Sequence, residues 1–330
     1  MILQDDHLHQ LISYLDLHPS NELHRWHEWQ IVPIAGGANN LLYRATSAHG
    51  DYAIKFTIRD ERDRAGREYA ALQAIQQTGM VLAPRAIWLN RDDFRQPVVV
   101  QTWLDGDVLT APPATTHDWR NLLDLYCRIH AITPEQTSIR LPPATLNVAS
   151  GAAGKTLIFE HLAKIPPDHR PTSLNPIITW LDAWQPPTWD TPPRALCRVD
   201  SNWRNFLRQP ERWVCVDWEN AGWGDPAFEW ADIITHPAYR DCDAPWELLI
   251  AAYADRMNDP TAPHRIATYT LIMRMWWVVR LARYLYEVPH GLDSRLIERP
   301  ASWQQDTIKQ YERYLANAKH AIEYNSANPS

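Results

Sequence analysis

The chain has 330 residues, of which 45% are hydrophobic and 22% are charged, a composition typical of globular proteins and long enough for two lobes. Its formal net charge of -7 argues against nucleic acid as the main partner, because domains that bind nucleic acids usually carry a basic surface. The four cysteines are scattered and form no C-x-x-C pair. This pattern indicates free thiols in a reducing compartment rather than a disulfide framework or a zinc site.

No segment has the pattern of a signal peptide or a membrane span. The first residues include acids and histidines where a signal peptide needs a basic start and an apolar stretch. The most apolar region, 269–288, is interrupted by Arg274, Arg280 and Arg283. We therefore expect a cytoplasmic protein without a membrane partner, and the sequence leaves the oligomeric state open.

The N-terminal part of the chain has the pattern of an antiparallel sheet with one main helix. Apolar residues at helical spacing predict a short leading helix over 5–17. His24 and His27 lie three apart with no third ligand in view, which favours a polar helix face over a metal site. Strands and turns then alternate, with a main helix at 62–77 and strands predicted over 29–35, 41–46, 52–56 and 97–104.

The pattern becomes mainly helical after Gly106. A Pro-rich interval at 142–193 contains two short helices, one ending near Ala163 and one near Trp184. Short strands are predicted over 196–207 and 213–217, and longer helices over 118–132, 245–256, 264–287 and 301–324, with a further helix covering 229–235. The sequence thus predicts an α+β fold with an N-terminal lobe at 1–104 and a helical C-terminal lobe at 105–330.

The strongest group of chemically suited residues lies on two adjacent loops. Asp200 and Asn205 share one loop, and Asp217 ends the next predicted strand. Phosphoryl transfer needs such a set, because one acid orients the attacking hydroxyl and accepts its proton while two oxygen ligands hold Mg²⁺. A lone Asp-x-x-x-x-Asn is more often an ordinary loop, but its pairing with Asp217 favours the functional interpretation.

These loops resemble the aminoglycoside phosphotransferase and choline kinase superfamily, whose motifs read His-Gly-Asp-x-x-x-x-Asn and Ile-Asp-Trp/Phe-Glu. Asp200 and Asn205 match the first motif, and Val216-Asp217-Trp218-Glu219 matches the second. The stretch at 221–228 then matches the family's Ala-Gly-Trp-Gly-Asp-Pro-Ala-Phe. The resemblance covers 29–235 and implies a two-lobe protein-kinase-like fold. It also implies that Asp200 is the catalytic base and that Asn205 and Asp217 bind Mg²⁺.

The resemblance extends to the N-terminal lobe. The run 36–43 resembles the family's Gly-Gly-x-x-Asn-x-x-Tyr turn, where glycines let the backbone approach phosphate oxygens. The run 52–55 resembles the kinase strand whose lysine touches the phosphates, and a glutamate follows on the next helix. The strand ending at 104 resembles the hinge that holds the adenine. The nucleotide-binding residues implied by the resemblance are Gly36, Gly37, Asn40, Lys55, Glu68, Thr102, Trp103 and Leu104.

Two positions differ from the family motif, because Arg198 and Val199 replace its His and Gly. Glu61 also lies close enough to Glu68 to compete for the role of lysine partner, and Asp225 before Pro226 fits a helix cap. We interpret the aromatic and methionine cluster at 273–277 as core rather than as a substrate platform.

The implied activity is transfer of the γ-phosphate of ATP, with Mg²⁺, to a hydroxyl of a small molecule. The sequence does not choose among aminoglycosides, macrolides, choline, amino sugars and homoserine as acceptor. The alternative is a catalytically weak or inactive nucleotide-binding regulator of the same fold. A protein kinase is less well supported, because no Phe-Gly follows Asp217 and no Ala-Pro-Glu is present.

Overall fold

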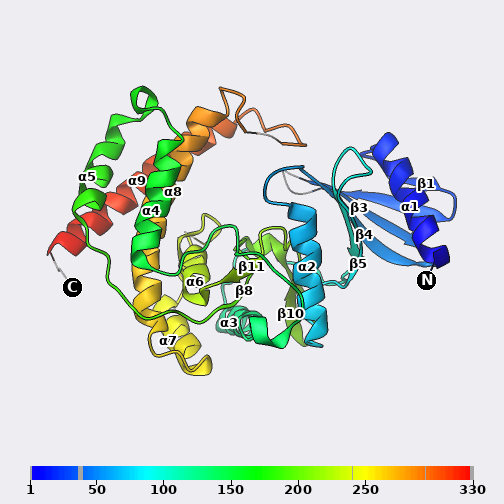
Figure 1. Ribbon diagram of the computed structural model, residues 1–330, viewed down its shortest axis with the longest axis horizontal. Helices are drawn as coiled ribbons and strands as arrows, with labels where there is room; N and C mark the ends of the chain where they lie inside the picture. The colour runs from blue at the N-terminus through cyan, green and yellow to red at the C-terminus, as the bar shows by residue number, and fades with distance from the viewer. Residues whose placement is uncertain (1, 36–39, 240, 294, 328–330) are drawn as a thin grey trace. The chain divides into compact units, whose positions relative to one another are not determined.

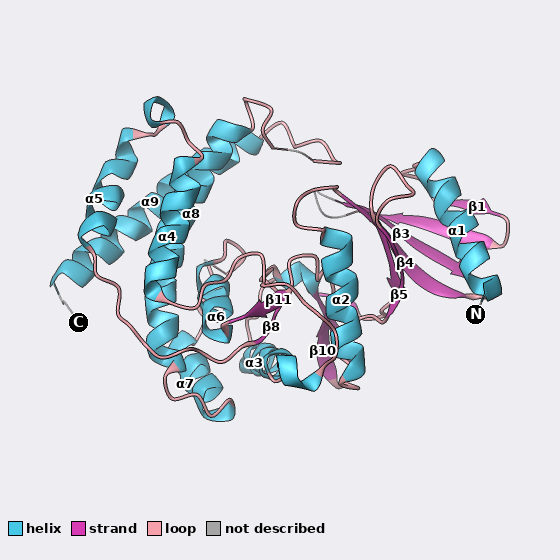
Figure 2. Ribbon diagram, viewed as in Figure 1, coloured by secondary structure: helices cyan, strands magenta, loops and turns pink. Residues whose placement is uncertain are grey.

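The computed structural model of the chain describes residues 2–35, 40–239, 241–293 and 295–327 (Figure 1). It confirms the predicted α+β fold, with an antiparallel sheet near the N-terminus and a helical C-terminal part (Figure 2). The chain divides into two compact units. The first unit comprises Met1–Leu146, Ala195–Trp223 and Arg295–Glu298, and the second comprises Asn147–Arg194, Gly224–Ser294 and Arg299–Ser330.

The first unit is built on a six-stranded antiparallel sheet in the order β1-β2-β3-β4-β6-β5. Residues 41 and 56 pair across β3 and β4, and residues 55 and 99 pair across β4 and β6. Lys55 therefore lies on the central strand β4, flanked on both sides by hydrogen-bonded neighbours. The strands are β1 (His24–Trp26), β2 (Trp29–Ile34), β3 (Asn40–Ser47), β4 (Gly50–Thr57), β5 (Ala86–Asn90) and β6 (Val98–Thr102).

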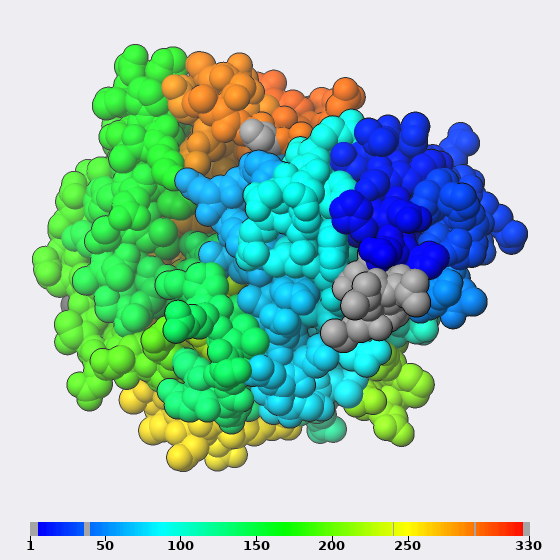
Figure 3. Space-filling view, turned by 45° about the vertical axis from the view of Figure 1, so that its right-hand side comes forward, coloured from blue at the N-terminus to red at the C-terminus, as the bar shows by residue number. Residues whose placement is uncertain are grey.

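Helices α1 (Ile2–Leu17) and α2 (Arg64–Gln77) cover opposite faces of this sheet (Figure 1). Leucine and isoleucine side chains of α1 form one core with Ile54, Phe56 and other inward residues of the strands. Side chains alternate along a strand, so Lys55 points to the opposite face, toward α2. Asp63 caps α2 by accepting a hydrogen bond from the Gly66 N–H at 3.2 Å. In the space-filling view, α1 forms the dark-blue outer surface of this unit (Figure 3).

Two small sheets and one helix complete the first unit. A three-stranded sheet has the order β10-β9-β7, and a two-stranded sheet pairs β11 with β8. Helix α3 starts with a capping box, in which the side chains and backbone N–H groups of Thr115 and Asp118 bond reciprocally. These elements are β7 (Asp107–Val108), α3 (Thr116–His130), η1 (Pro134–Gln136), β8 (Ala195–Cys197), η4 (Trp203–Asn205), β9 (Phe206–Gln209), β10 (Arg212–Cys215) and β11 (Gly222–Gly224).

The second unit is helical, and α8 (Ala262–Glu287) is its central element, packed against α4, α6, α7 and α9. Gly154 allows α4 to approach α8 closely, because a Cβ there would lie only 2.5 Å from Ile272 Cδ1. Asp225 caps α6, accepting from the Ala227 N–H at 2.9 Å. The other elements are α4 (Gly151–Ala163), η2 (Pro167–His169), η3 (Thr172–Leu174), α5 (Asn175–Ala183), α6 (Pro226–Thr235), α7 (Trp246–Arg256) and α9 (Trp303–Ala327).

Two expectations from the sequence are wrong in detail. His24 and His27 do not share a helix, because residues 24–26 form β1 and His27 has a φ of 51° in the hairpin turn to β2. The strand predicted over 196–207 is broken after residue 197, where Val199 adopts a φ of 56° and short polar side chains bond to their own backbone. Within the described ranges, no helix is both long and apolar enough to span a bilayer.

Candidate active site

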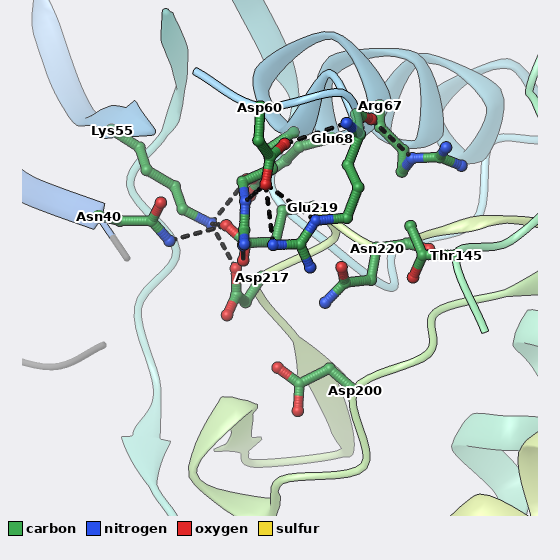
Figure 4. A network of polar contacts seen from close by, with 12 residues as sticks. Asn40, Lys55, Asp60, Arg67, Glu68, Thr145, Asp200, Asp217, Glu219 and Asn220 are labelled. Carbon is green, nitrogen blue, oxygen red and sulfur yellow. Dashed lines mark hydrogen bonds and ion pairs between the residues drawn. The ribbon is translucent and has the colours of Figure 1, made fainter. Parts of the chain in front are cut away.

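Lys55 lies within reach of three carboxylates in the first unit (Figure 4). Its Nζ donates to Glu68 Oε2 at 2.7 Å and to Asp217 Oδ1, and lies 3.4 Å from Glu219 Oε2. Lys55 is 6% exposed and Glu68 is fully buried. Because water is excluded from this cluster, its charges interact more strongly than they would on the surface.

A second buried cation, Arg64, lies in the first turn of α2. Its Nη1 donates to Glu219 Oε1 and its Nε to Asp60 Oδ2 at 2.9 Å. Glu219 also accepts from Asn40 Nδ2 at 2.8 Å, and Asn40 is the first residue of β3. Glu219 therefore connects α2 to β3, and through Lys55 it also connects them to β4 (Figure 4).

The carboxylates of this cluster outnumber its cations, and the pKa values of Glu68 and Asp217 are raised. Burial raises the pKa of Glu68 to about 7, although Lys55 acts in the opposite direction. Burial also raises the pKa of Asp217, and the charges of Glu219 and Asp200 add to the effect. Burial disfavours the charged form of Lys55 too, but the surrounding carboxylates raise its pKa well above the ordinary value. Lys55 is therefore charged, and the cluster carries excess negative charge that a bound cation would neutralise.

Oxygen atoms of Glu68, Asp217 and Glu219 lie within 4.8 Å of one another. Carboxylate oxygens without His or Cys ligands are the donors that hard cations such as Mg²⁺ prefer. The Asp217 side chain is 27% exposed, so its carboxylate is open on one side. Glu68 and Glu219 are buried and bonded to Lys55, Arg64 and Asn40, so Asp217 is the carboxylate of this set that fits a magnesium ion.

Asp200 lies apart from the Lys55 cluster, on the loop between β8 and η4 (Figure 4). Its Oδ1 accepts from the Asn202 N–H at 3.1 Å, and its Oδ2 accepts from Asn205 Nδ2 at 2.8 Å. These bonds orient the carboxylate, and they leave Asn205 Oδ1 without a hydrogen-bond partner in the described part of the chain. The loop therefore presents one carboxylate and one carboxamide oxygen, as expected from the Asp-x-x-x-x-Asn spacing.

Arg198 connects the Asp200 loop to the Asp217 loop. It is fully buried, and its Nη1 donates to the backbone carbonyls of Val216 at 3.3 Å and Asp217 at 3.2 Å. Val199 and Asp217 have φ values of 56° and 66°, a left-handed conformation that costs a non-glycine residue roughly 1–3 kcal/mol. The arginine thus holds the second loop by its backbone at a strained residue, whose side chain contacts Lys55.

The predicted hinge residues begin with Thr102, the last residue of β6. The Thr102 N–H donates to Arg85 O at 3.0 Å, and the Trp103 N–H donates to Asp51 O at 2.8 Å. Both donors are therefore already used within the protein, and of the three residues Leu104 retains an N–H without a bond to the described residues. The predicted phosphate-covering glycines, Gly36 and Gly37, lie outside the described residues, whereas Asn40 lies beside the Lys55 cluster.

Arg64, Asp60 and Glu219 were not singled out by the sequence analysis. Glu219 was part of a recognised motif but received no role. Arg64 and Glu68 are four residues apart on the predicted helix, so their shared face was a usable signal. The pairing of Arg64 with Glu219 had no local signal, because 155 residues separate the two. Glu61, the competitor of Glu68, is exposed.

A family model described as "Phosphotransferase enzyme family" matches residues 30–269. No curated protein matches the chain. A putative aminoglycoside phosphotransferase from Ralstonia eutropha JMP134 has a similar structure, with a TM-score of 0.65 and 15% identity over 96% of this chain and 97% of that chain.

Two further solved structures have the same fold. A choline/ethanolamine kinase family protein from Mesorhizobium loti gives a TM-score of 0.60 and 18% identity, covering 96% of this chain and 95% of that chain. A spectinomycin phosphotransferase in complex with ADP and spectinomycin gives a TM-score of 0.59 and 15% identity, covering 95% of this chain and 98% of that chain. The kinase-like fold predicted from the sequence is therefore confirmed.

Proposed function

Because the chain belongs to the phosphotransferase enzyme family, we propose that it transfers the γ-phosphate of ATP, with Mg²⁺, to a hydroxyl group of a small molecule. The observation that carries the proposal is the presence of two groups of polar side chains in the first unit. Lys55, Glu68 and Asp217 form one buried charged cluster, and Asp200 with Asn205 forms a separate hydrogen-bonded pair. A spectinomycin phosphotransferase of the same fold was crystallised with ADP, which supports a nucleotide as the donor.

In this proposal, Lys55 neutralises phosphate oxygens of the nucleotide. Its ion pair with Glu68 fixes the Nζ at the end of a four-carbon chain that would otherwise be mobile. Asp217 and Asn205 are the proposed magnesium ligands. A bound magnesium ion supplies charge neutralisation for the phosphates. Leu104, through its N–H, is the proposed donor to the adenine, since the N–H groups of Thr102 and Trp103 are already bonded.

Asp200 is the proposed catalytic base. Its carboxylate accepts the proton of the acceptor hydroxyl while the hydroxyl oxygen forms a bond to the γ-phosphorus. The bond between that phosphorus and the β–γ bridging oxygen breaks, and ADP leaves with the bonding electron pair. The hydrogen bonds from Asn202 and Asn205 fix the orientation of the carboxylate in advance, which is how such sites gain most of their rate.

The proposal is tested by measuring ADP release from Mg-ATP with a panel of aminoglycosides, macrolides, sugars, choline and amino alcohols. An acceptor-dependent signal that requires Mg²⁺ supports the proposal. A shift of the melting temperature by ATP without any turnover supports the alternative of an inactive nucleotide-binding protein. If ATP neither turns over nor changes the melting temperature, the proposed nucleotide site is wrong.

A further inference from the structure

The C-terminal part of α8 in the second unit gathers more cationic than anionic side chains. Arg283 Nε donates to Glu287 Oε1 at 2.6 Å, and Arg299 pairs with Asp293. Arg280 Nη1 forms an ion pair with Glu287 Oε2 at 4.0 Å, which is too long for a hydrogen bond. Both carboxylates are thus engaged by other guanidinium groups.

Arg280 is left without a hydrogen bond in the described part of the chain. Its Nη1 atom is buried and has no hydrogen-bond partner, while its guanidinium lies over the Tyr284 ring at 5.4 Å. The side chain as a whole is 31% exposed, so atoms of Arg280 other than Nη1 are open to solvent. Burial lowers the pKa of Arg280, and the charge of Arg283 lowers it further, although Glu287 and Asp293 act in the opposite direction. The surroundings therefore favour an additional negative charge beside Arg280.

His161 of α4 lies beside these arginines and carries no charge near pH 7. Burial, together with the charges of Arg283 and Arg280, lowers its pKa to about 4, so the ring is neutral near pH 7. Its Nδ1 lies 3.4 Å from Arg283 Nη1. A guanidinium nitrogen only donates, so Nδ1 accepts and the ring proton is on Nε2. His161 Nε2 is therefore a hydrogen-bond donor.

Trp276 adds a third donor on the same face of α8. It lies four residues before Arg280, and its ring meets the His161 ring edge-on at 5.4 Å between centroids. The side chain is 7% exposed, and its Nε1 is buried with no hydrogen-bond partner. A buried indole N–H usually has an acceptor. Helices α4 and α8 lie side by side (Figure 1).

We propose that Arg280, Trp276 and His161 form a binding site for an oxyanion group, a carboxylate or a phosphate, of a small organic molecule. All three supply N–H donors, and Arg280 adds a charge whose geometry suits two oxygen atoms at once. The inference goes beyond the proposed function.

Isothermal titration calorimetry on the full chain tests this site without nucleotide, at constant ionic strength. The probes are glycerate, glycerol 3-phosphate, glycerol and choline. We expect at least one of the two anions to bind and the neutral and cationic probes not to bind. Tighter binding of glycerate identifies a carboxylate site, and tighter binding of glycerol 3-phosphate identifies a phosphate site. If neither anion binds, or choline binds more tightly than both, the proposal is overturned.

Substitutions locate the site. Arg280→Gln should weaken anion binding at least about tenfold, because a charged hydrogen bond contributes roughly 1.5–3 kcal/mol. Arg280→Lys keeps the charge and should give an intermediate affinity. Arg274→Gln removes an exposed arginine of the same helix and should bind as the wild type does. Equal anion affinity in Arg280→Gln and Arg274→Gln would refute the site. Asp200→Asn should bind the anion as tightly as the wild type does. A failure of the anion-site proposal can therefore be told apart from a failure of the proposed phosphoryl transfer.

Discussion

Replacing Glu219 by glutamine removes one negative charge from the Lys55 cluster without changing the size of the side chain. Glu219 is 4% exposed and accepts hydrogen bonds from Arg64 and from Asn40. Burial opposes its ionisation, but Lys55 and Arg64 lower its pKa below the ordinary value. The carboxylate is therefore charged at neutral pH, and the substitution replaces an ion by a dipole.

The expected cost follows from the partners that remain. A glutamine retains only one acceptor oxygen and turns an NH₂ group toward groups that themselves donate. Breaking a buried ion pair by removing one partner costs about 3–5 kcal/mol when the other charge is left alone. Here Arg64 keeps Asp60, and Lys55 keeps Glu68 and Asp217. The loss of a carboxylate also relieves its repulsion of Asp217. We therefore expect a loss of about 3 kcal/mol in the free energy of unfolding, at the lower end of that range.

Urea unfolding at neutral pH, followed by circular dichroism, measures this loss. The matched control is Glu61→Gln, which is the same chemical change at an exposed position outside the cluster. The control should change the free energy of unfolding by less than about 0.5 kcal/mol. A Glu219→Gln variant as stable as the Glu61→Gln variant would refute the reasoning that this network stabilises the first unit.

Two further predictions concern the second unit. His161 has a folded-state pKa of about 4 against an ordinary 6.5, so the unfolded chain binds the extra proton between those values and stability falls as the pH drops through them. His161→Gln should remove up to about 3 kcal/mol of this pH dependence in urea unfolding, and an unchanged pH dependence would contradict the assignment. Gly154→Val should cost about 2 kcal/mol by forcing α4 away from Ile272. A double-mutant cycle with Ile272→Ala should show coupling of at least about 0.5 kcal/mol, whereas additive effects would rule out the contact.

Much of the fold was predictable, because local patterns carry it. The predicted helix ends near Ala163 and Trp184 agree to within one residue with the ends of α4 and α5, and Asp225 was correctly recognised as the cap of α6. The prediction of a helix face at His24 and His27 was wrong, because a spacing of three residues also fits a strand that leads into a hairpin turn. The hairpin depends on the left-handed conformation of His27, which histidine adopts only occasionally.

The sequence motifs were enough to group Asp200, Asn205 and Asp217, because their spacing is local to two adjacent loops. The functional roles of these three residues stay proposals. The contact of Arg64 with Glu219 depends on tertiary packing between distant segments, and sequence spacing has no information about it. The structural consequence of Arg198 was equally hidden, since its bonds to the Val216 and Asp217 carbonyls exist only once both loops are folded.

The most direct test of the proposed function follows the phosphoryl group itself. The protein is incubated with Mg-ATP labelled at the γ-phosphate and with the acceptor panel, and labelled products are separated by chromatography. The account predicts a labelled phosphate ester, formed at least about 100-fold more slowly by Asp200→Asn, since a general base contributes roughly 10²–10⁴-fold. An Asp200→Asn variant that forms the ester at nearly the wild-type rate would contradict the role of Asp200. Label released only as inorganic phosphate would contradict transfer to an acceptor.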